Sequence, residues 1–254
     1  MKGGLGEGMP PVFLVDAVPA GNRAVLEGDE ARHAATVRRM RVGERLVLTD
    51  GAGNLVSCVV TTVRTGRDVE LELDVEERWQ EPEPALRVVV AQALVKGDRG
   101  ELAVELATEA GADGVLPWRA ARCVARWEDG PRGEKALARW RATARAAAKQ
   151  ARRPWLPTVA EPVDTAGLVR VVRESAVALV LDAGAERTVA DVHLPASGDL
   201  VLVVGPEGGI APEEMGSLVE AGAVPVRLGR SVLRASTAAA VALGALGAVT
   251  TRWA

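Results

Sequence analysis

The chain has 254 residues, of which 48% are apolar and 26% charged, a composition that is typical of a globular protein and excludes a disordered one. Its formal net charge of -3 does not indicate a generally basic nucleic-acid binder, so any positive surface must be local. The two cysteines, Cys58 and Cys123, lie far apart and the two histidines, His33 and His193, form no ligand cluster, so neither a disulfide framework nor a metal site is expected.

Neither a leader nor a membrane span is expected from the apolar pattern. The N-terminal MKGGLGEGMPPVF has no apolar core of the kind that signal peptides contain. The longest weakly polar run, AAAVALGALGAV at 238–249, is too short and too rich in Ala and Gly to cross a bilayer. We therefore expect a cytoplasmic protein without a membrane partner.

The first 80 residues have the pattern of short β-strands. Several such strands separated by turn signals predict a small barrel or sandwich. One helix is expected at 29–40, with Asp29 as its N-cap. The acidic, proline-bearing segment 76–85 is predicted to be a linker, because each proline restricts itself and the residue before it. The predicted strands are 24–28, 45–50, 55–63 and 68–75.

After residue 85, strands alternate with helices. This alternation predicts a mostly parallel sheet that is covered by helices on both faces. The helix expected at 96–111 has Asp98 as candidate cap and Gly111 as the C′ residue. Two more helices are expected at about 132–151 and at 233–249. The predicted strands are 86–94, 113–118, 176–183, 199–204 and 223–229.

The stretch LVLVVGPEGGIAPEEM at 200–215 combines a buried strand, a glycine-rich turn and a helix start. Ligands of open parallel sheets bind beyond the carboxyl ends of strands, where glycines allow close approach. Glu207, Glu213 and Glu214 would repel a phosphate there, and both the Walker and the Rossmann glycine patterns are missing. A cationic or neutral ligand with a nucleoside portion fits better, and a tight turn without ligand is the alternative.

RLGRSVLRASTAAA at 227–240 is a second junction of this type. Its three arginines, Arg227, Arg230 and Arg234, are expected at the mouth of the sheet, although solvated arginines at a helix start are an alternative. Ser236 and Thr237 are candidates either to cap the last helix or to bind a substrate. The small residues that follow allow close helix packing, either within the core or against a second subunit.

Taken in order, these motifs resemble the SPOUT class of RNA methyltransferases. More closely, they resemble the bacterial family that methylates N3 of a uridine in 16S ribosomal RNA, which is numbered 1498 in the family. A segment resembling PUA domains precedes the catalytic part. The segments that carry the resemblance are HAATVRRMRVGE (33–44), KGDRGE (96–101), TEAG (108–111), QARRPWLP (150–157), VVGPEGGIAPEE (203–214) and LGRSVLRASTAA (228–239).

The resemblance implies an α/β protein with a PUA-like β-barrel domain over 1–80 and a SPOUT methyltransferase domain over 85–254. It also implies a C-terminal trefoil knot, a homodimer, and S-adenosylmethionine bound in the knot. A sulfonium cation and an adenosine suit an acidic glycine turn. The cofactor-binding residues implied are Leu181, Asp182, Ala183, Gly184, Val204, Gly205, Pro206, Glu207, Gly208, Gly209, Leu228, Gly229, Ser231, Val232, Leu233 and Arg234.

The reaction requires removal of a proton from N3 of the uracil, and a nearby cation would stabilise the developing negative charge. Arg234 is the first candidate for that role, and a salt bridge to Glu207 is its alternative. Ser236 stands where the family has a Glu in its L-R-x-E-T motif, so no general base is assigned to that position.

The predicted partner is 16S rRNA of the small ribosomal subunit, and two basic segments are expected to bind it. One is the Arg-rich stretch 31–45; the other is a stripe on the long helix at 141, 145, 149 and 152. An RNA-binding or ribosome-assembly module without activity, and a methyltransferase for another nucleotide, are the rival hypotheses. The predicted RNA-binding residues are Arg32, His33, Arg38, Arg39, Arg41, Lys96, Arg99, Arg141, Arg145, Lys149, Gln150 and Arg153.

Overall fold

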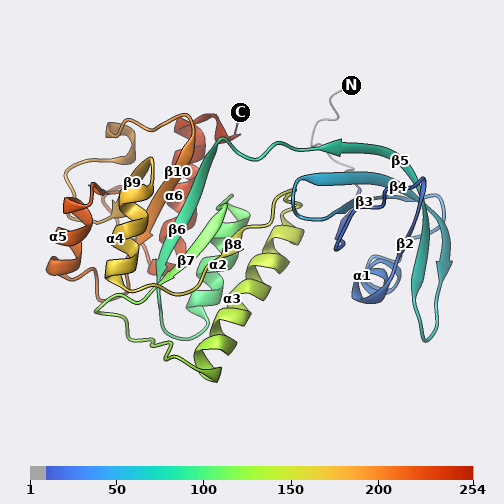
Figure 1. The fold of residues 1–254 in the computed structure, drawn as a ribbon, viewed down its shortest axis with the longest axis horizontal. Helices are drawn as coiled ribbons and strands as arrows, with labels where there is room; N and C mark the ends of the chain where they lie inside the picture. Colours follow the sequence, from blue (N-terminus) through green and yellow to red (C-terminus); the bar gives the residue numbers. More distant parts are fainter. Residues whose placement is uncertain (1–9, 254) are drawn as a thin grey trace. The chain divides into compact units, whose positions relative to one another are not determined.

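The structure, a computed structural model, describes residues 10–253 (Figure 1). The chain divides into two compact units. Unit 1 comprises the residues up to Glu83 together with Arg152–Trp155, and unit 2 comprises Pro84–Ala151 and the residues from Leu156 on. Residues 1–9, on which the expectation of a missing leader partly rests, lie outside the described residues.

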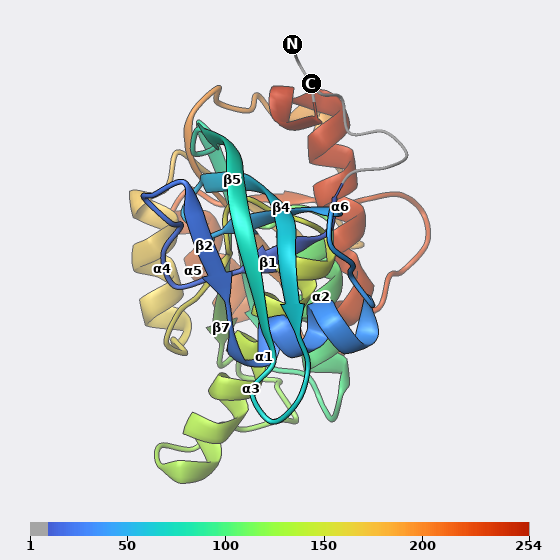
Figure 2. The same cartoon turned by 90° about the vertical axis from the view of Figure 1, so that its right-hand side faces the viewer.

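Unit 1 is built on a five-stranded sheet in the order β1-β3-β4-β5-β2, of which β4, β5 and β2 can be followed in Figure 2. Only the pair of β1 with β3 is parallel, and the other pairs are antiparallel. Phe13, Leu46 and Leu73 are among the side chains buried in its core. The predicted strands are confirmed, and the three-residue β1 was missed. The strands are β1 (Val12–Leu14), β2 (Arg23–Leu26), β3 (Arg45–Thr49), β4 (Asn54–Arg64) and β5 (Glu70–Gln80).

Three details of unit 1 differ from the prediction. The helix expected at 29–40 is a short helix, α1 (Gly28–Arg32), followed by a π-helical turn over His33–Val37. Its N-cap is Glu27, and Asp29 lies inside the first turn. The linker predicted at 76–85 begins only after Gln80, because the end of β5 still pairs with β4 as far as Asn54.

The segment Arg152–Trp155 belongs to unit 1 through contacts with a β-turn. The Gly53 N–H donates to the Pro154 carbonyl at 3.0 Å, and the Trp155 indole Nε1 donates to the Glu81 carbonyl at 3.1 Å. A Cβ at Gly53 would lie 2.5 Å from the Trp155 ring, and its φ is +83°. Only glycine therefore allows the indole to lie against this turn.

Unit 2 contains a six-stranded sheet in the order β11-β9-β10-β6-β7-β8. Every strand pair in it is parallel, as predicted from the alternation of strands with helices. The strands are β6 (Leu86–Ala93), β7 (Gly114–Trp118), β8 (Thr158–Val159), β9 (Val177–Leu181), β10 (Gly198–Val204) and β11 (Val224–Val226). The helices are α2 (Arg99–Glu109), α3 (Pro131–Gln150), α4 (Thr165–Glu174), α5 (Pro212–Glu220) and α6 (Ala235–Val249).

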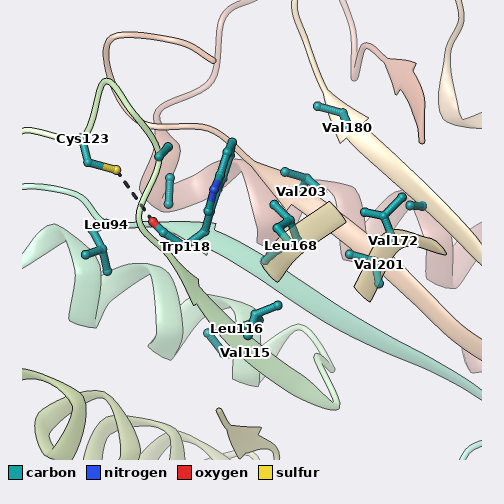
Figure 3. Close-up of a cluster of buried hydrophobic side chains, with 14 of the residues drawn as sticks. Leu94, Val115, Leu116, Trp118, Cys123, Leu168, Val172, Val180, Val201 and Val203 are labelled. Atoms are coloured by element: carbon teal, nitrogen blue, oxygen red, sulfur yellow. Dashed lines mark hydrogen bonds between the residues drawn. The ribbon is translucent and has the colours of Figure 1, made fainter. Parts of the chain in front are cut away.

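Both faces of this sheet are buried, because successive residues of a strand point to opposite sides. In β10, Val201 and Val203 pack in the cluster that contains side chains of α4 and α5 (Figures 1 and 3). Leu200 and Leu202 pack in the other cluster, with α6. In the first cluster, the Cys123 thiol donates to the Trp118 carbonyl at 3.8 Å (Figure 3).

Some details of unit 2 differ from the prediction. The helix α4 and the two-residue strand β8 were missed, although the Asp164 side chain accepts a capping hydrogen bond from the Gly167 N–H at 2.7 Å. Asp98 is the N-cap residue of α2, but its side chain makes no capping hydrogen bond. Gly111 follows the C-cap with φ +101°, as a C′ glycine does. The strand predicted to reach residue 229 ends at Val226.

Candidate cofactor pocket

A pocket of about 620 Å³ lies at the carboxyl ends of three neighbouring strands of unit 2. Leu181 ends β9, Val204 ends β10, Val226 ends β11, and all three line the pocket. The strands are parallel, so their carboxyl ends meet at one edge of the sheet. The two glycine-containing junctions of the sequence therefore face one space.

Most residues predicted for the cofactor lie in the wall of this pocket. The exceptions are Gly184 and Gly208, which do not line it. The Gly184 N–H instead donates to Asp182 Oδ1 at 3.1 Å, and Gly208 lies against Arg122. The predicted residues in the wall are Leu181, Asp182, Ala183, Val204, Gly205, Pro206, Glu207, Gly209, Leu228, Gly229, Ser231, Val232, Leu233 and Arg234.

The pocket also has lining residues that were not predicted for it. Arg99 was assigned to RNA, Arg227 was expected at the mouth of the sheet, and Ser236 was a candidate to bind a substrate. The others are apolar or small, so no chemical signal in the sequence marks them for the pocket. The additional lining residues are Val95, Arg99, Ile210, Pro212, Met215, Val226, Arg227, Ala235, Ser236 and Ala238.

The turn at 205–209 is tight and is fixed by its neighbours. Gly209 has φ +73° and its N–H donates to the Pro206 carbonyl at 2.9 Å. A Cβ at Gly205 would lie 2.7 Å from the Ile210 side chain. Arg122, in the loop after β7, donates from Nη1 to the Gly208 carbonyl at 3.2 Å. The glycines thus let the chain reverse next to the pocket without side chains that would fill it.

The glutamates near this turn have different roles. Glu214 is only 8% exposed, and its carboxylate accepts hydrogen bonds from the Ala121 N–H at 2.9 Å and the Thr165 hydroxyl at 2.5 Å. It therefore joins the loop after β7 and the first residue of α4 to the start of α5, and it is not among the pocket-lining residues. Glu207 is exposed in the wall and accepts from the Lys96 N–H at 3.4 Å. Glu207 and Asp182 are the acidic groups that line the pocket.

The three arginines of the second junction also differ from one another. The guanidinium of Arg227 donates to two backbone carbonyls, those of Ala185 and Glu186, so it is not a free cation at the mouth. Arg230 and Arg234 are exposed. Arg234 is the N-cap residue of α6 and lines the pocket. The ion pairs of the described part include none between Arg234 and Glu207, so that alternative is not supported.

Ser236 and Thr237 have separate environments. Ser236 is 3% exposed and lines the pocket. The Thr237 hydroxyl donates to the Arg234 carbonyl at 3.2 Å. The N-cap position of α6 belongs to Arg234, so neither hydroxyl residue is the N-cap.

In unit 1, the predicted RNA-binding arginines are exposed: Arg32, Arg38, Arg39 and Arg41. Arg39 has a left-handed backbone with φ +53°, which is unusual for a residue other than glycine. His33 is half-buried, and its ring packs edge-on against Phe13 with centroids 6.0 Å apart. The His33 ring therefore packs against a core side chain, whereas the four arginines are exposed to solvent.

The predicted stripe on α3 is only partly a free basic surface. Arg141 donates to the Val159 carbonyl at 3.2 Å and to Glu161 at 2.9 Å, so it fastens α3 to β8 and the segment after it. Arg152 lies beyond the helix with φ +54°. The remaining predicted residues of this region comprise exposed Lys96, Arg99, Arg145 and Gln150, and half-buried Lys149 and Arg153.

Within residues 10–253, the structure contains neither a cluster of metal-binding side chains nor a membrane-spanning helix. No group of three or more His, Cys, Asp or Glu side chains there is placed to hold a metal ion. No helix in that part is long and apolar enough to cross a membrane.

Comparison with known proteins shows the family. Residues 81–247 match the family of RNA methyltransferase domains, and residues 26–74 match that of RNA methyltransferase PUA domains. The ribosomal RNA small subunit methyltransferase E proteins of Mycobacterium bovis and Mycobacterium tuberculosis are each 54% identical to the chain, over 95% of it and 93% of their own length. The chain belongs to the ribosomal RNA small subunit methyltransferase E family.

Solved structures agree with this family. A methyltransferase E of Neisseria gonorrhoeae bound to S-adenosylmethionine superposes with a TM-score of 0.80, at 26% identity over 95% of this chain and 98% of that one. A methyltransferase of Legionella pneumophila with the same cofactor bound has a TM-score of 0.81 at 26% identity, with the same coverage. The predicted α/β fold with a PUA-like domain, and the prediction of an S-adenosylmethionine-dependent RNA methyltransferase, are confirmed.

Proposed function

We propose that this methyltransferase E family member methylates N3 of a uridine in 16S rRNA of the small ribosomal subunit, at the position numbered 1498 in the family. The proposal that the protein binds S-adenosylmethionine rests on the pocket at the ends of β9, β10 and β11. Its volume of about 620 Å³ is in the usual range for small-molecule sites, about 300–1,000 Å³. The proposal that the substrate is 16S rRNA is supported by the 54% identity to relatives named for the RNA of the small subunit. A ribosomal substrate also favours a cytoplasmic location.

The residues of the pocket fit the methyl donor. When bound, S-adenosylmethionine supplies an electrophilic methyl group on a sulfonium cation. Asp182 and Glu207 place two carboxylates in the wall that can pair with a sulfonium cation, and Arg99, Arg227 and Arg234 line the same pocket. Gly205 and Gly209 of the 205–209 turn line the pocket, and because they lack side chains an adenosine can approach the backbone there.

Arg234 is the proposed group for the uracil. In the proposed transfer, the N3–C bond would form as the C–S bond of the bound donor breaks, with the electron pair left on sulfur and the N3 proton lost to solvent. Arg234 is exposed at the pocket rim, where its guanidinium would stabilise negative charge that develops on the uracil oxygens. We expect Arg234→Ala to lower kcat by about 100-fold, a size typical of one charge-stabilising donor. Because Arg234 also lines the cofactor pocket, kcat is compared at saturating S-adenosylmethionine. Equal kcat values for Arg234→Ala and wild type would remove Arg234 from this role.

The RNA is proposed to bind the exposed arginines of unit 1 together with the basic residues of unit 2. Arg38, Arg39 and Arg41 provide three exposed cations within four positions. Removing an arginine that neutralises a phosphate should reduce the salt dependence of RNA binding by about one unit of slope. Replacing the three by Gln and measuring affinity for a 16S fragment at several salt concentrations tests this assignment. An unchanged slope would exclude unit 1 as the electrostatic surface.

The domain limits 1–80 and 85–254, the trefoil knot and the homodimer are also part of the proposal. For the dimer, support comes from α6, which leaves Val241 and Val249 exposed at 45% and 52% and does not fully bury Gly244, Ala245 and Ala248. Its other small residues, Ala238, Ala239 and Ala242, pack in the core of unit 2. Exposed apolar side chains beside small residues favour contact with another helix. Sedimentation equilibrium should give twice the monomer mass of 26.5 kDa, and a monomer at micromolar concentration would contradict it.

The rival function is an RNA-binding or ribosome-assembly module without catalysis, motivated by Ser236 in place of the family Glu. Isothermal titration with S-adenosylmethionine separates the two: no binding at millimolar cofactor favours the rival. Mapping modified bases in 16S rRNA from a strain that lacks the gene tests the position. Loss of N3-methyluridine at that single site supports our proposal, and its persistence there would overturn it.

A further inference from the structure

Arg227 follows β11 and contacts a loop that helps to form the pocket. This loop, defined here as residues 182–187, leaves β9 where the Asp182 N–H donates to the Val226 carbonyl at 3.0 Å. It returns where the Arg227 N–H donates to the Arg187 carbonyl at 2.9 Å. The first two loop residues, Asp182 and Ala183, line the pocket.

The side chain of Arg227 holds the middle of the same loop. Its Nη1 donates to the Ala185 carbonyl at 2.8 Å and also to the Glu186 carbonyl. A charged guanidinium makes stronger hydrogen bonds to carbonyls than a neutral donor does. The loop has little other fixation by side chains of its own: Asp182 Oδ1 accepts from the Gly184 N–H at 3.1 Å.

The far end of the loop is fixed as well. Asp191 accepts hydrogen bonds from the Thr188 N–H at 2.7 Å and from its hydroxyl at 2.8 Å, and Thr188 forms a parallel β-bridge with Arg227. Between these anchored ends, the Ala185 N–H donates to the Asp182 carbonyl at 3.2 Å, and the two carbonyl contacts of Arg227 join the middle of the loop to the residue after β11. We propose that Arg227 is a positioning residue: by bracing the loop 182–187 it sets Asp182 and Ala183 for binding S-adenosylmethionine, an inference that rests on the proposed function.

The test compares three variants by isothermal titration with S-adenosylmethionine. Arg227→Met removes the donors but keeps an unbranched side chain, and we expect Kd to rise about tenfold, the loss associated with one hydrogen bond to a charged group. Arg227→Lys keeps the charge but lacks the guanidinium fork, so its Kd should lie between those of wild type and Arg227→Met. Arg230→Met, which removes an exposed arginine three positions along, should bind as wild type.

Kinetics and hydrogen exchange separate bracing from other roles. For Arg227→Met, the KM for S-adenosylmethionine should rise with kcat nearly unchanged at saturating cofactor, and the amides of 182–187 should exchange faster. Wild-type affinity in Arg227→Met, or full recovery in Arg227→Lys, would overturn the proposal, since recovery by any cation means that charge alone matters. So would a loss of RNA affinity with cofactor affinity intact.

Hydrogen exchange keeps this test separate from that of the proposed function. If wild-type protein failed to bind S-adenosylmethionine, the proposed function would fail, whereas faster exchange in 182–187 would still show that Arg227 braces the loop. If Arg227→Met did not fold, the intermediate Kd and exchange rates expected of Arg227→Lys would decide.

Discussion

Gly209 offers a sharp test of the pocket, because its substitution should act on cofactor binding more than on folding. A Cβ there would have as its nearest neighbour Arg122 Nη1 at 4.0 Å, so a larger side chain occupies open space at the pocket wall. Its φ of +73° makes Gly209→Val strained by about 2 kcal/mol. For a chain of this size, that strain lowers the melting temperature by about 4–8 °C.

The binding free energy of the cofactor should fall by more than this strain. The valine methyl groups would take space that the cofactor needs, and we expect at least about a 100-fold rise in Kd, which corresponds to about 2.7 kcal/mol. Gly222→Val is the matched control, because Gly222 also has a positive φ, +106°, with nothing within 4 Å, and it is not among the pocket-lining residues. Calorimetric titration and thermal melting of both variants give the two quantities.

The reasoning would be refuted if Gly209→Val, folded at 25 °C, bound S-adenosylmethionine with wild-type affinity. It would also be refuted if Gly222→Val lost affinity to the same degree, because the loss would then follow backbone strain and not the pocket wall.

Three further predictions concern stability and reactivity. Arg252 forms a buried ion pair with Asp113 at 2.8 Å, with the side chains 12% and 7% exposed, so Arg252→Ala should destabilise unit 2 by about 3 kcal/mol in urea unfolding; a change below 1 kcal/mol would show that the pair is not needed. Burial raises the pKa of the Cys58 thiol to about 11, so a thiol reagent at pH 8 should label it only in denaturant, and rapid labelling of folded protein would contradict that burial. Hydrogen bonds from Thr188 lower the pKa of the Asp191 carboxyl. The ionised carboxylate therefore stabilises the folded protein at neutral pH, and this contribution is lost as the pH falls through the lowered pKa. Thr188→Ala should raise the NMR titration midpoint of Asp191.

Much of unit 2 could be predicted because its signals are local. The apolar runs of β6, β9 and β10, separated by helical segments, indicate parallel strands without knowledge of distant contacts. The glycine-containing junctions at 205–209 and 227–234 follow strand ends, and in a parallel sheet such ends meet at one edge.

What could not be predicted depends on contacts between residues far apart in the chain. In the sequence, Glu214 lies a few residues after the glycine turn, where an acidic group was expected to face a ligand. In the structure, its carboxylate accepts a hydrogen bond from the Ala121 N–H, 93 positions away, and Glu214 is not among the pocket-lining residues. Arg227 and Arg234 have the same charge and lie seven positions apart. The Arg227 guanidinium, however, donates hydrogen bonds to carbonyls 41 and 42 positions away. Only the fold decides which charged side chain is engaged by backbone and which is exposed at the pocket.

The most direct measurement is methyl transfer itself. Purified protein would be incubated with methyl-labelled S-adenosylmethionine and small ribosomal subunits from a strain that lacks the gene, and the labelled nucleotide would be identified by mass spectrometry. Our account predicts one methyl group per subunit, on N3 of the uridine numbered 1498 in the family, and no label on subunits from the parent strain. Label on a different nucleotide or atom, or no transfer by protein that binds the cofactor, would contradict it.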